Sequence, residues 1–152
     1  MHGLPRSTRT VLLESALVND DELRVEPGLD WTAGDYIGII TSNAQAFASE
    51  SFYILSYDQG TGLVELDGNL TYSHFGDYES TADDFDGLDF RSEVVLFTRN
   101  IKIQASLDDV SYSLQDAWGC RVLVADFFER DWTQQTGQVE LDYVEIFNCS
   151  QR

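Results

Sequence analysis

The sequence predicts an all-β protein. Helical periodicity is scarce along the chain, and short apolar runs recur instead, bounded by Gly, Asp, Asn or Ser. Nine Phe, seven Tyr and three Trp residues, together with abundant Val and Ile, favour strands over helices. Hydrophobic residues make up 43% of the chain, which is enough for a packed core and argues against disorder.

Nine segments have the composition of short strands. They are residues 9–13, 22–25, 36–41, 51–57, 62–66, 93–97, 101–105, 120–125 and 138–147. Turn signals separate several of them, as at Pro27-Gly28, Ala33-Gly34-Asp35 and Asp58-Gln59-Gly60.

Many short strands fit either an irregular right-handed parallel β-helix (a solenoid) or a β-sandwich. The run Val94-Val95-Leu96-Phe97 is apolar at every position, as in a strand covered on both sides. Val139 and Leu141 alternate with polar residues, and Val144 and Ile146 then alternate in the opposite phase. A corner between two coil strands would produce this shift, although a β-bulge in a sandwich strand would do so too.

We therefore expect a β-helix, with a β-sandwich as the alternative. Residues 1–152 are expected to form a single domain. The residues expected to supply much of the core are Val94, Leu96, Ile101, Ile103, Val122, Val124, Val139, Leu141, Val144 and Ile146.

The charge balance excludes some classes of partner. Twenty-seven carboxylates face nine Lys and Arg residues, giving a formal net charge of −18. Such a surface repels phosphate backbones and anionic lipids, which argues against nucleic acid and acidic membranes as partners. Divalent cations, basic proteins and neutral glycans stay possible, and exposed Trp118 or Trp132 could stack against a sugar.

The acidic segment 76–89 is predicted to be a loop, because it contains little core material. Asp83, Asp84, Asp86 and Asp89 provide the density of oxygen ligands that Ca²⁺ prefers, and Gly87 permits a sharp turn. The EF-hand spacing and its final Glu are absent. A solvated acidic loop is the alternative to a calcium site.

His74 lies in a strand-like context between Tyr72 and Phe75. It is the residue to consider as a general base or metal ligand if the protein is an enzyme. A structural histidine is the favoured interpretation, because the sequence offers no evident catalytic companion or second zinc ligand.

Asn69-Leu70-Thr71 and Asn148-Cys149-Ser150 are N-glycosylation sequons. Asn69 follows Asp67-Gly68, where a turn would expose it. Asn148 is next to a cysteine and is the less favoured acceptor.

Several segments resemble the fibrocystin-L and cell-surface hyaluronidase family, in the β-helix region that follows a small glycine-named domain. The N-terminal run His2-Gly3-Leu4-Pro5-Arg6 is similar, as is the stretch from Asp30-Trp31 through Gly34-Asp35. Glu50 precedes an apolar strand, as in the family. The other matching segments are 66–76 (LDGNLTYSHFG), 91–103 (RSEVVLFTRNIKI) and 144–151 (VEIFNCSQ).

This resemblance implies that residues 1–152 are the first coils of a β-helix in a longer extracellular or cell-surface protein. It also implies two function classes. One is a structural or adhesion module within a larger assembly. The alternative is a calcium-dependent carbohydrate-binding or hyaluronan-depolymerising ectodomain. Hyaluronan is a polyanion, and a surface of charge −18 without clustered Arg and Lys is poorly suited to it. We therefore favour the non-catalytic class.

A disulfide between Cys120 and Cys149 is expected. Twenty-nine residues separate the two cysteines, about one turn of an irregular solenoid, so they would lie on neighbouring coils ~4.8 Å apart. Secretion, which the resemblance implies, favours the bridge because an oxidising compartment seldom leaves neighbouring thiols unpaired. The alternative is two buried free thiols.

Overall fold

A computed structural model describes residues 1–42, 46–77, 89–104, 120, 122–147 and 149. The chain divides into two compact units. That residues 1–152 belong to one domain, the first coils of a β-helix, stays a prediction. We call Arg6–Thr98 the sheet unit, and Met1–Pro5 with Arg99–Arg152 the disulfide unit. Within the described residues, no helix is sufficiently long and apolar to cross a membrane.

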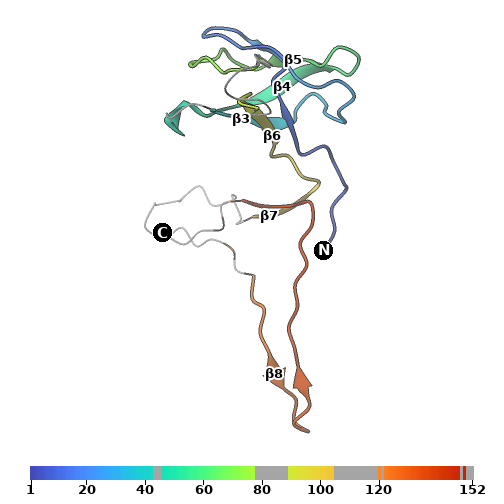
Figure 1. The fold of residues 1–152 in the computed structure, drawn as a ribbon. Helices are drawn as coiled ribbons and strands as arrows, with labels where there is room; N and C mark the ends of the chain where they lie inside the picture. The colour runs from blue at the N-terminus through green and yellow to red at the C-terminus, as the bar shows by residue number, and fades with distance from the viewer. Residues whose placement is uncertain (43–45, 78–88, 105–119, 121, 148, 150–152) are drawn as a thin grey trace, which may run out of the picture. The chain divides into compact units, whose positions relative to one another are not determined.

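The sheet unit is built on a six-stranded antiparallel sheet with the order β1-β6-β3-β4-β5-β2 (Figure 1). The strands are β1 (Arg9–Val11), β2 (Glu22–Arg24), β3 (Tyr36–Ile40), β4 (Glu50–Asp58), β5 (Leu63–Leu66) and β6 (Glu93–Leu96). A short 3-10 helix, η1 (Ala46–Ala48), precedes β4. An isolated antiparallel bridge between Leu12 and Val25 joins the segments that follow β1 and β2. The sheet therefore curls until its two outer strands meet.

The core lies on the inward face of this curled sheet. Side chains alternate along each strand, so Ile37 and Ile39 of β3 point inward together with Val94 and Leu96 of β6. The buried hydrophobic cluster consists of Leu12, Ala16, Leu23, Val25, Trp31, Ile37, Ile39, Ile54, Val64, Leu66, Leu70, Val94 and Leu96. Each of these side chains is at most 5% exposed.

The all-β prediction is confirmed, but the parallel β-helix is wrong for the sheet unit, where every strand pair is antiparallel. The physical reason is the length of the connections. β4 ends at Asp58 and β5 begins at Leu63, and so short a loop can only reverse the chain, because a parallel pair needs a crossover of roughly a dozen residues. The turn at Asp58-Gln59-Gly60 is therefore the tip of a hairpin.

The disulfide unit contains the parallel pairing that was expected. β7 (Ile101–Gln104) pairs in parallel with β10 (Val144–Phe147), with Ile101 opposite Val144. β8 (Phe127–Phe128) and β9 (Gln134–Gln135) form a small antiparallel hairpin that the sequence analysis did not predict. The predicted strand 120–125 is absent from its described residues.

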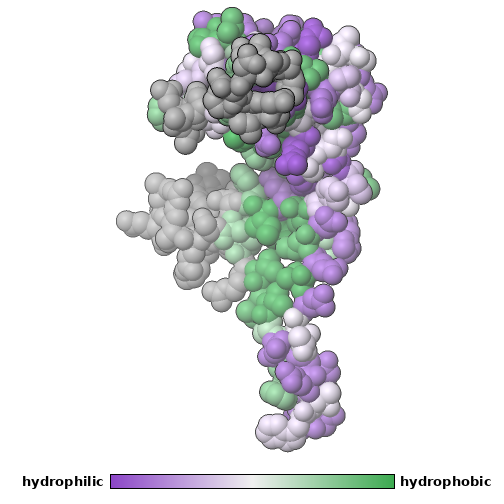
Figure 2. Space-filling model, in the orientation of Figure 1, coloured by the Kyte–Doolittle hydropathy of each residue, from purple (hydrophilic) through white to green (hydrophobic). Residues whose placement is uncertain are grey.

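Part of the predicted core of the disulfide unit is exposed. Val122, Val124, Val139, Leu141 and Ile146 are 39–52% exposed. Figure 2 shows hydrophobic residues gathered on the visible face of this unit, over β7 and the segments that lead toward β8. The apolar alternation was recognised correctly, but the described residues do not cover this face.

Candidate functional site

His74 forms a buried pair with Glu50, the first residue of β4. The Nε2 atom of His74 lies 3.1 Å from Oε1 of Glu50, and the two side chains are 0% and 10% exposed. The same carboxylate accepts hydrogen bonds from the backbone N–H groups of Thr71 (2.8 Å) and Tyr72 (2.9 Å). Glu50 thus fastens the segment after β5 to the start of β4.

These contacts fix the charge of Glu50. Burial by itself would raise the pKa of this carboxyl group. Hydrogen bonds from the backbone of Thr71 and Tyr72 and from the His74 ring outweigh that effect, and the pKa is lowered. Glu50 is therefore ionised at neutral pH and acts as an acceptor for its three partners.

The buried position of His74 limits its chemistry. A general base must come within hydrogen-bond distance of its substrate, yet this side chain has no exposed surface in the structure. The other ring nitrogen, Nδ1, is buried and has no hydrogen-bond partner among the described residues. The backbone N–H of His74 donates to the carbonyl of Ala16 (2.8 Å), and the N–H of Ala16 donates to the carbonyl of His74 (3.0 Å). These contacts hold His74 in place, and its structural role stays a prediction.

A second polar cluster surrounds Asp35, immediately before β3. Arg6 donates from Nη1 to Oδ1 of Asp35 (2.8 Å) and from Nη2 to Oδ2 (2.7 Å), a bidentate pair. Arg6 also contacts the carboxylate of Asp30 at 3.4 Å. Trp31 is buried beside this cluster, and its Nε1–H donates to the carbonyl oxygen of Ser7 (2.7 Å).

The turn of this cluster explains its sequence pattern. Asp35 accepts from the backbone N–H of Thr32 (2.8 Å), and its own N–H donates to the carbonyl of Thr32 (3.1 Å). Between them, Gly34 has a φ of +88°, which glycine adopts at little cost. Burial alone would raise the pKa of Asp35, but hydrogen bonds from Arg6 and Thr32 and the charge of Arg6 lower it. The segment from Asp30 to Asp35 therefore contains a turn that is closed by the hydrogen bonds between Thr32 and Asp35.

A row of aromatic rings, which the sequence analysis did not predict, crosses the outward face of the sheet. Tyr36 of β3 lies between Tyr53 of β4 and Phe97, which follows β6, with ring centroids 4.8 Å and 5.6 Å apart. The side chains of Tyr53 and Phe97 are 52% and 42% exposed. Finding this row requires the strand register, because the three residues are distant in sequence.

Comparison with known proteins places these observations in a family context. No family model matches the chain. Fibrocystin-L of Mus musculus and of Homo sapiens are each 28% identical to it over 152 residues, which is 99% of this chain and 4% of theirs. The cell migration-inducing and hyaluronan-binding protein of Homo sapiens is 25% identical over 131 residues, 85% of this chain and 9% of that protein. The chain is homologous to fibrocystin-L and to the hyaluronan-binding proteins.

The match is to a small part of each relative, so the chain corresponds to a segment of large proteins. Among solved structures, a tailspike of Acinetobacter baumannii bacteriophage AP22, in complex with a capsular saccharide, is similar over 60% of this chain and 15% of that one. The TM-score is 0.43 at 11% identity, too low to support an argument about function.

In this homologue of fibrocystin-L, the expected calcium site falls largely outside the described residues. Asp83, Asp84 and Asp86 lie there. Asp89 is described, and it pairs with Arg91, whose Nη2 donates to Oδ2 at 2.6 Å. No group of three or more His, Cys, Asp and Glu side chains that could hold a metal occurs in the described parts of the chain. The site stays a prediction.

The two sequons differ in what the structure describes. Asn69 is exposed, and its Nδ2 donates to the carbonyl oxygen of Asn19 (2.7 Å). Asn148 lies outside the described residues. Glycosylation of either asparagine also stays a prediction.

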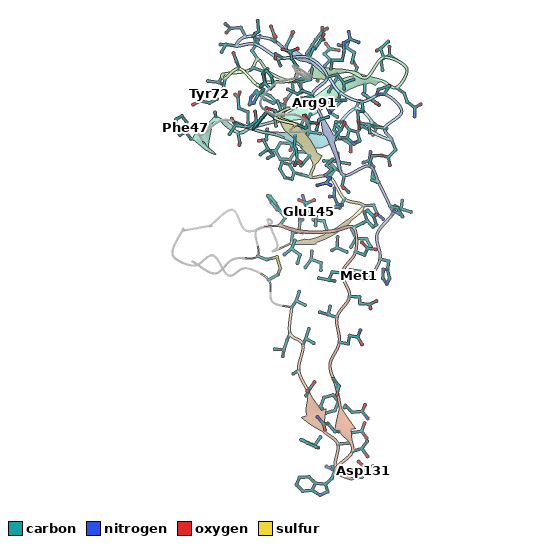
Figure 3. The ribbon with its side chains drawn as sticks, viewed as in Figure 1. Met1, Phe47, Tyr72, Arg91, Asp131 and Glu145 are labelled. Atoms are coloured by element: carbon teal, nitrogen blue, oxygen red, sulfur yellow. A yellow bond between two sulfur atoms is a disulfide. The ribbon has the colours of Figure 1, made fainter. Side chains whose placement is uncertain are left out.

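The expected pair of cysteines is joined. A disulfide links Cys120 to Cys149, with Cα atoms 4.4 Å apart, and is drawn in yellow in Figure 3. Lys102 of β7 contacts Glu145 of β10 at 3.1 Å, a contact between neighbouring parallel strands. Of the two tryptophans considered for sugar stacking, Trp132 is 82% exposed and Trp118 lies outside the described residues.

Proposed function

We propose that this chain is a non-catalytic structural and adhesion module within a larger extracellular protein. The observation that carries the proposal is that the polar residues of the segments resembling the family form hydrogen bonds within the fold. Asp35 and Glu50 direct their oxygens to backbone N–H groups and to Arg6 or His74 inside the same unit. Residues committed to closing turns contribute to stability, and function must then reside in the surface they support.

The disulfide unit supports a second part of the proposal, that the chain forms part of a β-helix in a longer protein. Parallel pairing of β7 with β10 is the kind of strand stacking that neighbouring coils require. The half-exposed Val122, Val124, Val139 and Leu141 then correspond to the inner wall of a coil. Each coil of a solenoid buries its apolar face only against its neighbours, so this unit would be completed by further coils.

An extracellular location fits both the chemistry and the relatives. Disulfides persist in oxidising compartments and are rare in the cytosol. The Cys120–Cys149 bridge is therefore consistent with secretion. One human relative, whose match covers 80% of this chain at 25% identity, carries the name cell surface hyaluronidase. We infer that this chain is displayed outside the cell.

That name also supplies the alternative, a carbohydrate-binding or hyaluronan-depolymerising role with calcium as a possible cofactor. The chain covers 8% of that hyaluronidase, so the activity of the whole relative need not involve the corresponding segment. The net charge of −18 opposes the approach of a polyanion. These two facts favour the structural role.

An assay of hyaluronan length separates the two functions. Purified chain is incubated with hyaluronan, with and without Ca²⁺, and the polymer is sized by gel electrophoresis. We expect full-length hyaluronan, together with a lowered midpoint of thermal unfolding for His74→Ala. Shortening of hyaluronan by the parent chain, abolished in a His74→Ala variant with an unchanged unfolding midpoint, would instead establish catalysis.

A further inference from the structure

The aromatic row lies on the face of the sheet opposite to the core. Along β3, Ile37 and Ile39 are buried in the core, so Tyr36, Gly38 and Ile40 point outward. Antiparallel register places Tyr36 opposite Tyr53, and the backbone N–H of Phe97 donates to the carbonyl of Tyr36 (2.8 Å). Three aromatic side chains, from β4, β3 and the residue after β6, therefore stand side by side.

Glycine at position 38 allows the row to lie close to the sheet. A Cβ atom added at Gly38 would come within 2.5 Å of Cε2 and 2.7 Å of Cζ of Phe97. The Phe97 ring thus covers the backbone at Gly38, and Gly38 is buried although it faces outward. The ring is fixed by this contact and by Tyr36, so a ligand that stacks on it would immobilise little extra side-chain freedom.

The row has apolar ring faces and a polar border. Tyr36 Oη and Ser51 Oγ are hydrogen-bonded at 2.6 Å beside the rings. Asp67, whose Oδ1 accepts from the backbone N–H of Tyr53 (2.8 Å), is exposed at one border. Hydroxyl and carboxylate acceptors next to exposed rings match a ligand that offers both C–H faces and hydroxyl donors.

Charge decides among the possible occupants. A second copy of the chain would bring another surface of charge −18 against this face, and long-range repulsion opposes that contact. The same repulsion disfavours polyanionic glycans. A neutral sugar meets no such barrier, and its ring C–H groups can lie against the electron-rich faces of Tyr and Phe.

We propose that Tyr36, Tyr53 and Phe97 form a stacking surface for a neutral glycan. The inference rests on the adhesive role proposed above and identifies its contact surface and partner class. The three rings span roughly two strand spacings, ~10 Å, about the length of a disaccharide. Successive ring planes are inclined by 39° and 40°, so the three rings do not form one flat platform.

The test titrates the full chain with neutral oligosaccharides of known linkage. Cellohexaose, xylohexaose, mannohexaose and chitohexaose serve as probes, and a hyaluronan hexasaccharide is the anionic comparison. Amide chemical shifts in two-dimensional NMR report binding and its location. We expect at least one neutral probe to shift the amides of Tyr36, Tyr53 and Phe97, with a weaker effect from the hyaluronan fragment.

Variants assign the binding to the rings. Tyr53→Ala should weaken binding of that probe about tenfold, whereas Tyr53→Phe, which keeps the ring, should bind within about twofold of the parent. Phe47→Ala is the matched control. Phe47 is 70% exposed, and its ring contacts Tyr72 (Figure 3), which is not part of the row, so its removal should leave binding unchanged. Near-UV circular dichroism checks that each variant is folded.

Several outcomes would overturn the proposal. They are no shift with any neutral probe, shifts confined to residues outside the row, equal binding by folded Tyr53→Ala, or stronger binding of the hyaluronan fragment. Self-association of the parent chain that Tyr53→Ala removes, measured by sedimentation, would assign the row to a second copy. None of these outcomes affects the structural role of Glu50 and His74, which the unfolding measurements test separately.

Discussion

Arg6 donates hydrogen bonds to both carboxylate oxygens of Asp35, from Nη1 at 2.8 Å and from Nη2 at 2.7 Å. Arg6 begins the sheet unit and Asp35 directly precedes β3, so the pair ties the incoming chain to the start of a central strand. Asp35 is only 5% exposed and Arg6 17% exposed, which weakens solvent screening of their attraction. Most isolated surface ion pairs lack this combination of bidentate geometry and burial.

Removing one partner of this pair should destabilise the sheet unit substantially. Arg6→Ala leaves the Asp35 carboxylate buried with only its Thr32 contacts, and we expect a loss of roughly 3 kcal/mol in the free energy of unfolding. Arg6→Lys keeps the charge but loses the two-pronged contact, so its effect should be smaller. Urea unfolding measures both, with the Arg6→Ala/Asp35→Ala double variant completing the cycle. Additive effects of the two single substitutions would contradict a direct coupling.

The same pair predicts how stability depends on acid. The pKa of Asp35 is lowered in the folded state, so the unfolded carboxyl binds its proton first as the pH falls, near its ordinary value of about 3.9. The stabilisation is therefore complete above that pH and disappears as the pH drops through the lower, folded value.

Comparison with a variant isolates this effect from the other acidic groups. We expect the stability difference between the parent chain and Asp35→Asn to be constant from pH 8 to about pH 5 and to shrink below about pH 4. Urea unfolding at a series of pH values measures it. A difference that grows on acidification would show that the pKa of Asp35 is raised rather than lowered.

Much of the strand content could be predicted from the sequence, because alternation and turn residues are local signals. The first seven predicted segments coincide with β1 to β7 to within one or two residues at each end. The direction of pairing was predicted less well. It depends on which strands become neighbours. The short connection 59–62 requires an antiparallel hairpin, whereas the apolar run at Val94 favoured the prediction of a parallel β-helix.

The candidate site shows the same division between local and distant signals. The turn at Asp30, Trp31 and Asp35 could be recognised from its residue types, yet its partner Arg6 lies 29 residues from Asp35 and has no local signature. Glu50 was noted only for its place before a strand, while its contact with His74 depends on how the segment after β5 packs against the start of β4. β8 and β9 were missed because Phe127-Phe128 and Gln134-Gln135 are too short to show alternation.

Glu50 should be more important to stability than its position at a strand end suggests. Glu50→Ala removes the acceptor of two backbone N–H groups and of His74, and a buried donor left without a partner costs about 1–3 kcal/mol. Glu50→Gln keeps one acceptor oxygen and should cost less. Exposed Glu65, whose contact is to Ser56, provides a matched control in Glu65→Ala. Equal stabilities of Glu50→Ala and Glu65→Ala would remove Glu50 from its role as a clamp.

Gly62, in the hairpin between β4 and β5, and Gly28, in the turn after β2, allow a comparison that separates backbone strain from crowding. Gly62 and Gly28 have similar positive φ angles, +76° and +84°. A Cβ atom at Gly62 would collide with the carbonyl oxygen of Val25, whereas nothing lies within 4 Å of one at Gly28. Val25 also donates its N–H to the carbonyl of Gly62 at 2.9 Å, so the crowding occurs where the β2 and β5 segments meet.

Gly28→Ala should therefore lower the free energy of unfolding by about 1–2 kcal/mol, the cost of a left-handed conformation for an L-residue. Gly62→Ala carries the same cost and must also push two hydrogen-bonded segments apart, so we expect it to be clearly the more damaging. Urea unfolding of both variants, with hydrogen exchange at the Val25 amide as a local probe, tests this. If the two variants lose equal stability and Val25 keeps its protection, the close approach of Gly62 to Val25 does not contribute to holding the curled sheet closed.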